Sequence, residues 1–180
     1  MKTRHVTIFS GHEFEVPQSI QRIDHRATHG WQLRYGGTKL FSDGLPADGS
    51  RAAESLARAT KELLRRINTL PAPSLLQRSP SSNKTSGLPV GISGPIVRLR
   101  RGSTLRDCSL AVLIPRYGDK PLRRSVYIGT ENTYTVERFH EALERAVAMR
   151  AEAVEAYEKA ATRDRRAGAR EHRKKLNGAA

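Results

Sequence analysis

The stretch "HGWQLRYGGTKLFSDG", residues 29–44, decides how the first half of the chain folds. Apolar and polar side chains alternate up to Gly36 and Gly37, after which a short second run begins. This pattern predicts a β-hairpin, because successive side chains of a strand face opposite sides and glycine readily adopts the positive φ values of a tight turn.

The alternation assigns each side chain before the turn to one of two faces. The polar residues Gln32 and Arg34 would face away from the core. The large apolar residues between and beside them would pack in it: Trp31, Leu33 and Tyr35.

Two strand registers remain open for this hairpin. A two-residue turn places Arg34 opposite Lys39, and like charges at that position destabilise a hairpin unless a phosphate or base edge absorbs them. The same register places Phe41 on the outer face. A bulge at Gly37 or Thr38 would instead bring Phe41 into the core opposite Leu33, and would weaken the case for Lys39 on the outer face.

The composition of the 180-residue chain indicates an anionic partner. Lys and Arg number 32 against 18 Asp and Glu, which gives a net charge of +14. Such a surface attracts nucleic acid or anionic membranes.

No apolar run reaches the roughly 18 residues of a membrane span, and the N-terminus lacks the apolar core of a signal peptide. We therefore expect a cytoplasmic, nucleoid-associated protein without a membrane partner. Cys108, the only cysteine, excludes an internal disulfide and a multi-thiolate zinc site, and no cofactor or metal is expected.

The order of elements predicts an internal duplication. Residues 71–87 are rich in Pro, Ser and Asn and read as a linker, with short β-like runs followed by one amphipathic helix on either side. The predicted fold is therefore α+β, with two tandem modules at residues 18–70 and 88–160. Each is a three-stranded antiparallel sheet packed on one α-helix. Residues 1–17 would form an N-terminal hairpin or extension, and residues 161–180 a basic C-terminal tail. The basic run at residues 162–175 is either a charged tail or an exposed helix.

Both helices have recognisable starts in the sequence. The first should begin at about Ser50, capped by Asp48 or Ser50, and the second should follow an N-cap at Thr135. The second helix offers a surface for a homodimer, although no sustained heptad repeat appears. The predicted strands are residues 19–23, 30–35 and 38–41 in the first half and residues 94–101, 107–118 and 121–129 in the second.

Three stretches carry a resemblance to a known family. These are "IQRIDHRATHGWQLRYGGTKLFSDG" (20–44), "SGLPVGIS" (86–93) and "VYIGTENTYTVERFHEALERAVAMR" (126–150). They resemble the bacterial and phage relatives of the plant ethylene-response-factor and Apetala type of DNA-binding domain, in two tandem copies. The resemblance implies that each sheet lays the face opposite its helix in the DNA major groove, where Arg and aromatic side chains make the contacts.

Thirteen residues are candidates for DNA binding. Gln32 suits the edge of adenine and Arg34 that of guanine. Arg22 and Arg26 are expected at phosphates, and Lys39 on the outer face beside Arg34. Tyr127, in the second half, is at a position where members of the family often have an aromatic residue that stacks on a base or packs on a sugar. The candidates of the second half are Arg98, Arg100, Arg101, Arg116, Lys120, Arg123, Arg124 and Tyr127.

These observations predict a sequence-preferring DNA-binding protein that regulates transcription. The alternatives are an architectural or nucleoid-associated protein with little sequence preference, a double-stranded RNA-binding module, whose usual opening helix is not evident, and a protein-interaction adaptor. No nucleophile, base and orienting residue occur in a recognisable arrangement, and no glycine-rich phosphate loop follows a strand, so we expect no enzymatic activity.

Overall fold

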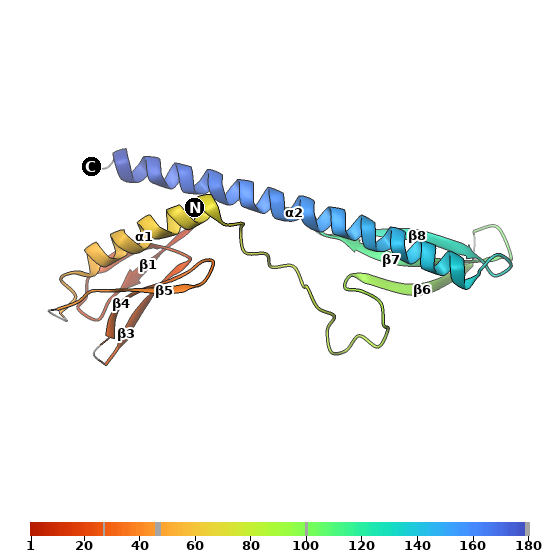
Figure 1. Ribbon diagram of the computed structural model, residues 1–180, viewed down its shortest axis with the longest axis horizontal. Helices are drawn as coiled ribbons and strands as arrows, with labels where there is room; N and C mark the ends of the chain where they lie inside the picture. The colour runs from red at the N-terminus through yellow and green to blue at the C-terminus, as the bar shows by residue number, and fades with distance from the viewer. Residues whose placement is uncertain (27, 46–47, 100, 179–180) are drawn as a thin grey trace. The chain divides into compact units, whose positions relative to one another are not determined.

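The computed structural model describes residues 1–26, 28–45, 48–99 and 101–178. These residues form three antiparallel sheets and two helices, which confirms the α+β class (Figure 1). Besides the two three-stranded sheets, residues near the N-terminus form the hairpin that the sequence offered for residues 1–17, which makes a third sheet in addition to the two tandem modules. The chain divides into two compact units, one comprising Met1–Pro73 with the chain from Thr162 onward, the other Ser74–Ala161.

The additional sheet belongs to the core of the first unit. Strands β1 (Thr3–Thr7) and β2 (Glu13–Pro17) pair as a hairpin. Val16 of β2 is fully buried, and the ring of Phe14 meets the ring of Trp31 edge-on with centroids 5.6 Å apart. The alternation of Phe14 and Val16 thus supplies apolar surface that the main sheet of this unit lacks.

The main sheet of the first unit has the strand order β3-β4-β5. Its strands are β3 (Ile20–His25), β4 (Thr28–Arg34) and β5 (Thr38–Ser42). Helix α1 (Ala52–Thr69) packs against β4 and β5 on one face of this sheet (Figure 1). The largest fully buried side chains between helix and sheet are Ile20, Trp31, Leu33, Leu63 and Ile67.

The start of α1 differs from the predicted cap. The helix follows Arg51, and no side chain caps its first turn. Asp48 instead accepts hydrogen bonds at one oxygen, Oδ1, from the backbone N–H of Ser50 at 2.9 Å and from its hydroxyl at 2.6 Å. Asp and Ser form such local turns readily, so this pair closes the turn before the helix rather than capping it.

The second unit contains the strand order β6-β7-β8 and the first part of α2 (Val136–Gly178). Its strands are β6 (Ile92–Leu99), β7 (Arg106–Ile114) and β8 (Leu122–Thr130). The small residues Ala142 and Ala146 let α2 approach the sheet closely and are fully buried. Thr135 Oγ1 accepts the backbone N–H of Arg138 at 3.2 Å, which confirms the predicted N-cap.

Of the two alternatives for the basic C-terminal run, a charged tail or an exposed helix, the structure has a helix. The run is the end of α2, and from Thr162 onward it belongs to the first unit. Ala169 is buried in that unit's core. The N-terminal ammonium of Met1 donates to the carbonyl of Gly168 at 3.3 Å, and Arg165 donates to the hydroxyl of Ser19 at 2.7 Å. The helix is not fully exposed as expected, because the two small residues Gly168 and Ala169 within the charged run let it pack closely.

Candidate nucleic-acid interface

The face of the β3–β5 sheet that points away from α1 is here called the first outer face. Trp31 and Leu33 are fully buried on the helix side, so the neighbouring residues of β4 point the other way. In the observed register Gln32 lies between Gln21 of β3 and Leu40 of β5. The first outer face consists of Gln21, Ile23, Gln32, Arg34, Thr38 and Leu40.

Gln32 and Arg34 lie on this face as the sequence predicted. Arg34 Nε donates to Gln32 Oε1 at 2.6 Å, so the two side chains form one unit. The Gln32 amide keeps its two N–H donors and a second lone pair on the oxygen, and the terminal nitrogens of Arg34 keep their donors. The pair therefore presents hydrogen-bond donors to acceptors such as guanine O6 and N7 or a phosphate.

The hairpin register matches neither of the two considered from the sequence. Arg34 pairs with Thr38, Leu33 with Lys39 and Trp31 with Phe41, so Tyr35 joins both glycines in a three-residue connection. Gly36 and Gly37 adopt φ values of 60° and 105°, as expected.

Lys39 consequently lies on the helix side of the sheet. Its Nζ is 5.2 Å from the ring centroid of Phe41, with which it shares that face. The expectation that Lys39 faces Arg34 on the outer face was wrong, because one additional residue in the connection reverses the side on which each residue of β5 lies.

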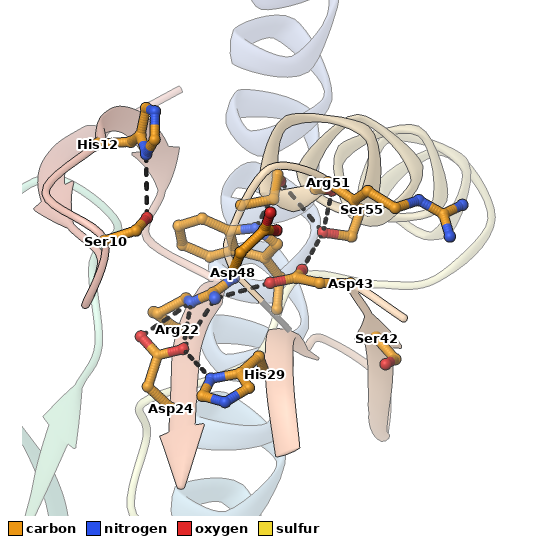
Figure 2. A network of polar contacts seen from close by, with 12 residues as sticks. Ser10, His12, Arg22, Asp24, His29, Ser42, Asp43, Asp48, Arg51 and Ser55 are labelled. Atoms are coloured by element: carbon orange, nitrogen blue, oxygen red, sulfur yellow. Dashed lines mark hydrogen bonds and ion pairs between the residues drawn. The ribbon is translucent and has the colours of Figure 1, made fainter. Parts of the chain in front are cut away.

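Arg22 also lies on the helix side, within the polar network shown in Figure 2. Its Nη2 contacts Asp24 Oδ1 at 2.8 Å and Asp43 Oδ2 at 2.7 Å, and its side chain is 7% exposed. The guanidinium carbon is 5.0 Å from the centroid of Trp31. These contacts place Arg22 in the interior of the unit and away from the first outer face, where a phosphate contact was expected.

The same network joins the end of β5 to α1. Asp43 is buried and accepts the hydroxyl of Ser55 at 2.5 Å in addition to Arg22 (Figure 2). Burial acts to raise the pKa of Asp24, but hydrogen bonds from Arg22 and His29 outweigh it, so the pKa falls from its ordinary value. The network holds the sheet against the helix, on the face opposite the first outer face.

The second outer face is the side of the β6–β8 sheet opposite the helix-covered core. Leu110 and Val112 of β7 are buried under α2, so Ser109, Ala111 and Leu113 point to the opposite face, on which Ala111 is itself buried. The pairs across the sheet place Tyr127 beside Ser109 and Arg123 beside Leu113. Arg98 of β6 faces outward opposite Asp107. Tyr127 is 52% exposed.

Arg124 lies opposite Val112 on the helix side of this sheet. Consecutive residues of a strand point to opposite faces, so Arg123 and Arg124 do not share one, although both were candidates for the same interface. Arg124 remains exposed at the edge strand β8.

Four candidates lie in turns rather than on a sheet face. Arg116 is held in the β7–β8 turn, where its Nη1 contacts Asp119 at 2.9 Å and its Nε donates to the carbonyl of Lys120 at 2.9 Å. Arg100, a further candidate, lies outside the described residues. The candidates in turns are Arg26, Arg101, Arg116 and Lys120, all of them exposed.

Four residues of the first outer face were not among the candidates: Gln21, Ile23, Thr38 and Leu40. Gln21 is opposite Gln32, and Leu40 is opposite Gln32 on the other side with an exposed fraction of 43%. Gln21 could have been found from its position directly after the buried Ile20. Leu40 could not, because the register that brings it outward depends on the three-residue connection. An exposed leucine there suits apolar contact with a thymine methyl group.

Clusters of metal ligands and helices that could span a membrane are two further features to consider in the described residues. Residues 1–26, 28–45, 48–99 and 101–178 bring no three His, Cys, Asp or Glu side chains together as metal ligands. Across the same ranges, each helix is too short or too polar to cross a membrane. Comparison with protein families, curated proteins and solved structures found no match.

Proposed function

We propose that the chain is a sequence-preferring double-stranded DNA-binding protein that regulates transcription. The proposal rests on Gln32 and Arg34, which are joined by a hydrogen bond on the face of the sheet opposite its helix. Gln and Arg are the side chains that most often read adenine and guanine in the major groove, and an antiparallel sheet face fits into that groove. The net charge of +14 supplies the attraction to the phosphate backbone.

The two three-stranded sheets, each with a helix on one face, would act as tandem modules. The second outer face contributes Arg123 and Tyr127, which suit a phosphate and a base or sugar, respectively. Exposed cations in the turns would add phosphate contacts that strengthen binding to every sequence alike. Two weak modules on one chain gain affinity through linkage alone.

The test is selection from a pool of randomised duplex DNA at about 150 mM salt, near physiological ionic strength, followed by sequencing of the retained fraction. We expect an enriched motif, and we expect Arg34→Ala to reduce the preference for that motif by about 1–3 kcal/mol. Arg65→Ala removes an equally charged side chain, 63% exposed on α1, and is the matched control. Lack of retention on duplex DNA refutes the proposal.

A second candidate function is architectural DNA binding with little sequence preference. The observation favouring it is the centre of the second outer face, where Ser109, Ala111 and Ser125 are too short to reach far into a groove. Retention of duplex without an enriched motif supports this function. Competition by double-stranded RNA of equal length would instead assign the binding to a helical nucleic acid recognised by its backbone.

We further infer a non-catalytic role in the cytoplasm at the nucleoid. A homodimer through α2 would use the face of the helix that packs on neither sheet. Exposed apolar residues of α2 include Val147 and Met149. Sedimentation of the protein alone and on its selected duplex measures the stoichiometry.

A further inference from the structure

The segment between the first helix and the third sheet forms one wall of a cavity on the second outer face. The cavity has a volume of about 390 Å³, near the lower end of the range of roughly 300–1,000 Å³ for ligand sites. Four of its lining residues are outer-face positions of the sheet: Ser93, Ala111, Leu113 and Arg123. The opposite wall is formed by residues 81–86, which the sequence assigned to a linker.

Lys84 anchors this wall to the sheet. Its Nζ donates to the carbonyl oxygens of Pro89 at 2.6 Å and Ile92 at 2.8 Å, and its backbone N–H closes a turn onto Ser81 at 3.0 Å. An ammonium has three donors, so one remains for a ligand. Since both acceptors are uncharged carbonyls, the positive charge of Lys84 is not neutralised by them.

The remaining lining is rich in hydrogen-bond donors and cationic. Among the described residues, the guanidinium of Arg123 has no hydrogen-bond or ion-pair partner, and none of the residues lining the cavity is acidic. Two cations therefore face one cavity with small polar side chains around them. Those side chains belong to Ser81, Asn83, Thr85, Ser86 and Ser93.

We propose that this cavity is a phosphate-binding site, held by Arg123 and Lys84, with hydroxyl groups of the anchored segment donating to the remaining phosphate oxygens. A guanidinium and an ammonium with adjacent hydroxyls match the charge and the acceptor-only character of a phosphate. The bound phosphate is either a backbone phosphate of DNA on the second outer face or a free phosphate ligand. The first of these alternatives rests on the proposed function. The segment at residues 81–86 is then part of the binding surface.

The first arm of the test uses inorganic phosphate and needs no DNA. The isotope-labelled full-length chain is titrated with sodium phosphate, against sodium chloride at equal ionic strength, and its ¹H–¹⁵N spectrum is recorded. We expect saturable shifts at the amides of residues 83–86 and at Arg123 Nε, with a dissociation constant in the millimolar range. Arg123→Gln and Lys84→Gln should each weaken binding at least tenfold, while Arg170→Gln, an equal change of charge on an exposed position of α2, should leave it unchanged.

The second arm measures duplex affinity against salt concentration for the same variants. The slope of the logarithm of the binding constant against the logarithm of salt concentration is compared between the variants. A slope smaller by about one in Arg123→Gln but not in Arg170→Gln assigns the site to a DNA phosphate. An unchanged slope together with phosphate binding in the first arm assigns it to a free phosphate ligand. Phosphate binding without any duplex binding supports the site and refutes the proposed function. Equal shifts with chloride, or binding that survives Arg123→Gln, overturn the site whatever the DNA result.

Discussion

The guanidinium of Arg66 in α1 donates to the carbonyl oxygen of Gly37 at 2.9 Å, and through the same nitrogen, Nη1, to that of Tyr35 at 2.8 Å. Leu70 lies so close to Gly36 that a Cβ at that position would overlap its side chain. The last turn of the helix thus holds both ends of the three-residue connection and packs on its middle. These contacts hold the connection in the conformation in which Arg34 pairs with Thr38.

Replacing Arg66 should therefore loosen the hairpin connection. We expect Arg66→Ala to lower the free energy of unfolding of the first unit by about 2 kcal/mol, the typical contribution of hydrogen bonds from a charged donor. Urea unfolding followed by the fluorescence of Trp31, the only tryptophan, measures it. The neighbouring Arg65→Ala is the control. That side chain is 63% exposed and, among the described residues, forms hydrogen bonds with Glu62 alone, so its loss should cost less than about 1 kcal/mol. Equal effects of the two substitutions would contradict this role.

Removing the carboxylate of Asp43 should be more costly still. Asp43→Ala leaves the buried guanidinium of Arg22 with Asp24 as its remaining ion-pair partner, and breaking a buried pair costs about 3–5 kcal/mol. The same fluorescence measurement applies, with Glu54→Ala as the control, because the Glu54 side chain is 67% exposed in its pair with Arg51. A loss below about 1 kcal/mol for Asp43→Ala would show that water or a rearranged Asp24 compensates.

The end of α2 should be needed for the stability of the first unit. Ala169 is 3% exposed, so a larger side chain has no space, and overpacking costs about 1–3 kcal/mol. Ala169→Leu should therefore lower the urea midpoint reported by Trp31. Ala156→Leu makes the same change at an exposed position of the same helix and should leave the midpoint unchanged. If both variants unfold like the original protein, the end of α2 does not pack as described.

The first unit should lose stability in acid through Glu62. Hydrogen bonds from Arg65 and Arg66 lower the pKa of Glu62 from 4.5 to about 2. A carboxylate whose pKa is lower in the folded state stabilises the fold fully above its unfolded pKa and loses this contribution as the pH falls through the folded value. Stability should thus decline between about pH 5 and pH 2. Glu62→Gln should flatten this decline, and an unaltered pH profile in that variant would exclude Glu62 as its source.

Tyr127 should contribute to DNA affinity through its ring. Tyr127→Ala is expected to weaken duplex binding by on the order of 1 kcal/mol, about fivefold, if the ring stacks on a base or packs on a sugar. Tyr127→Phe should retain most of the affinity. Tyr134, which is 42% exposed and follows β8, provides the matched control when changed to Ala. Equal losses at both positions would argue against a specific contact of Tyr127.

Local pattern determined much of this fold. The alternation from Trp31 to Arg34 placed two residues in the core and two on the outer face, and the apolar spacing of α1 and the cap at Thr135 located both helices. These features depend on neighbours in the chain, which is why the sequence by itself predicts them. The charge balance likewise indicates an anionic partner, because it is a property of composition that no folding changes.

Only the tertiary structure decided which face several charged residues occupy. Ile20 and Ile23 are both apolar but lie on opposite faces of β3, and burial of Ile20 under the helix carries Arg22 inward. Lys39 follows a connection that is held by Arg66, far along the chain, and Ala169 is buried by contacts with the first unit. In each case the neighbouring residues leave two arrangements nearly equal in energy, and packing against a distant part of the chain selects one of them. The local sequence pattern therefore does not predict which one forms.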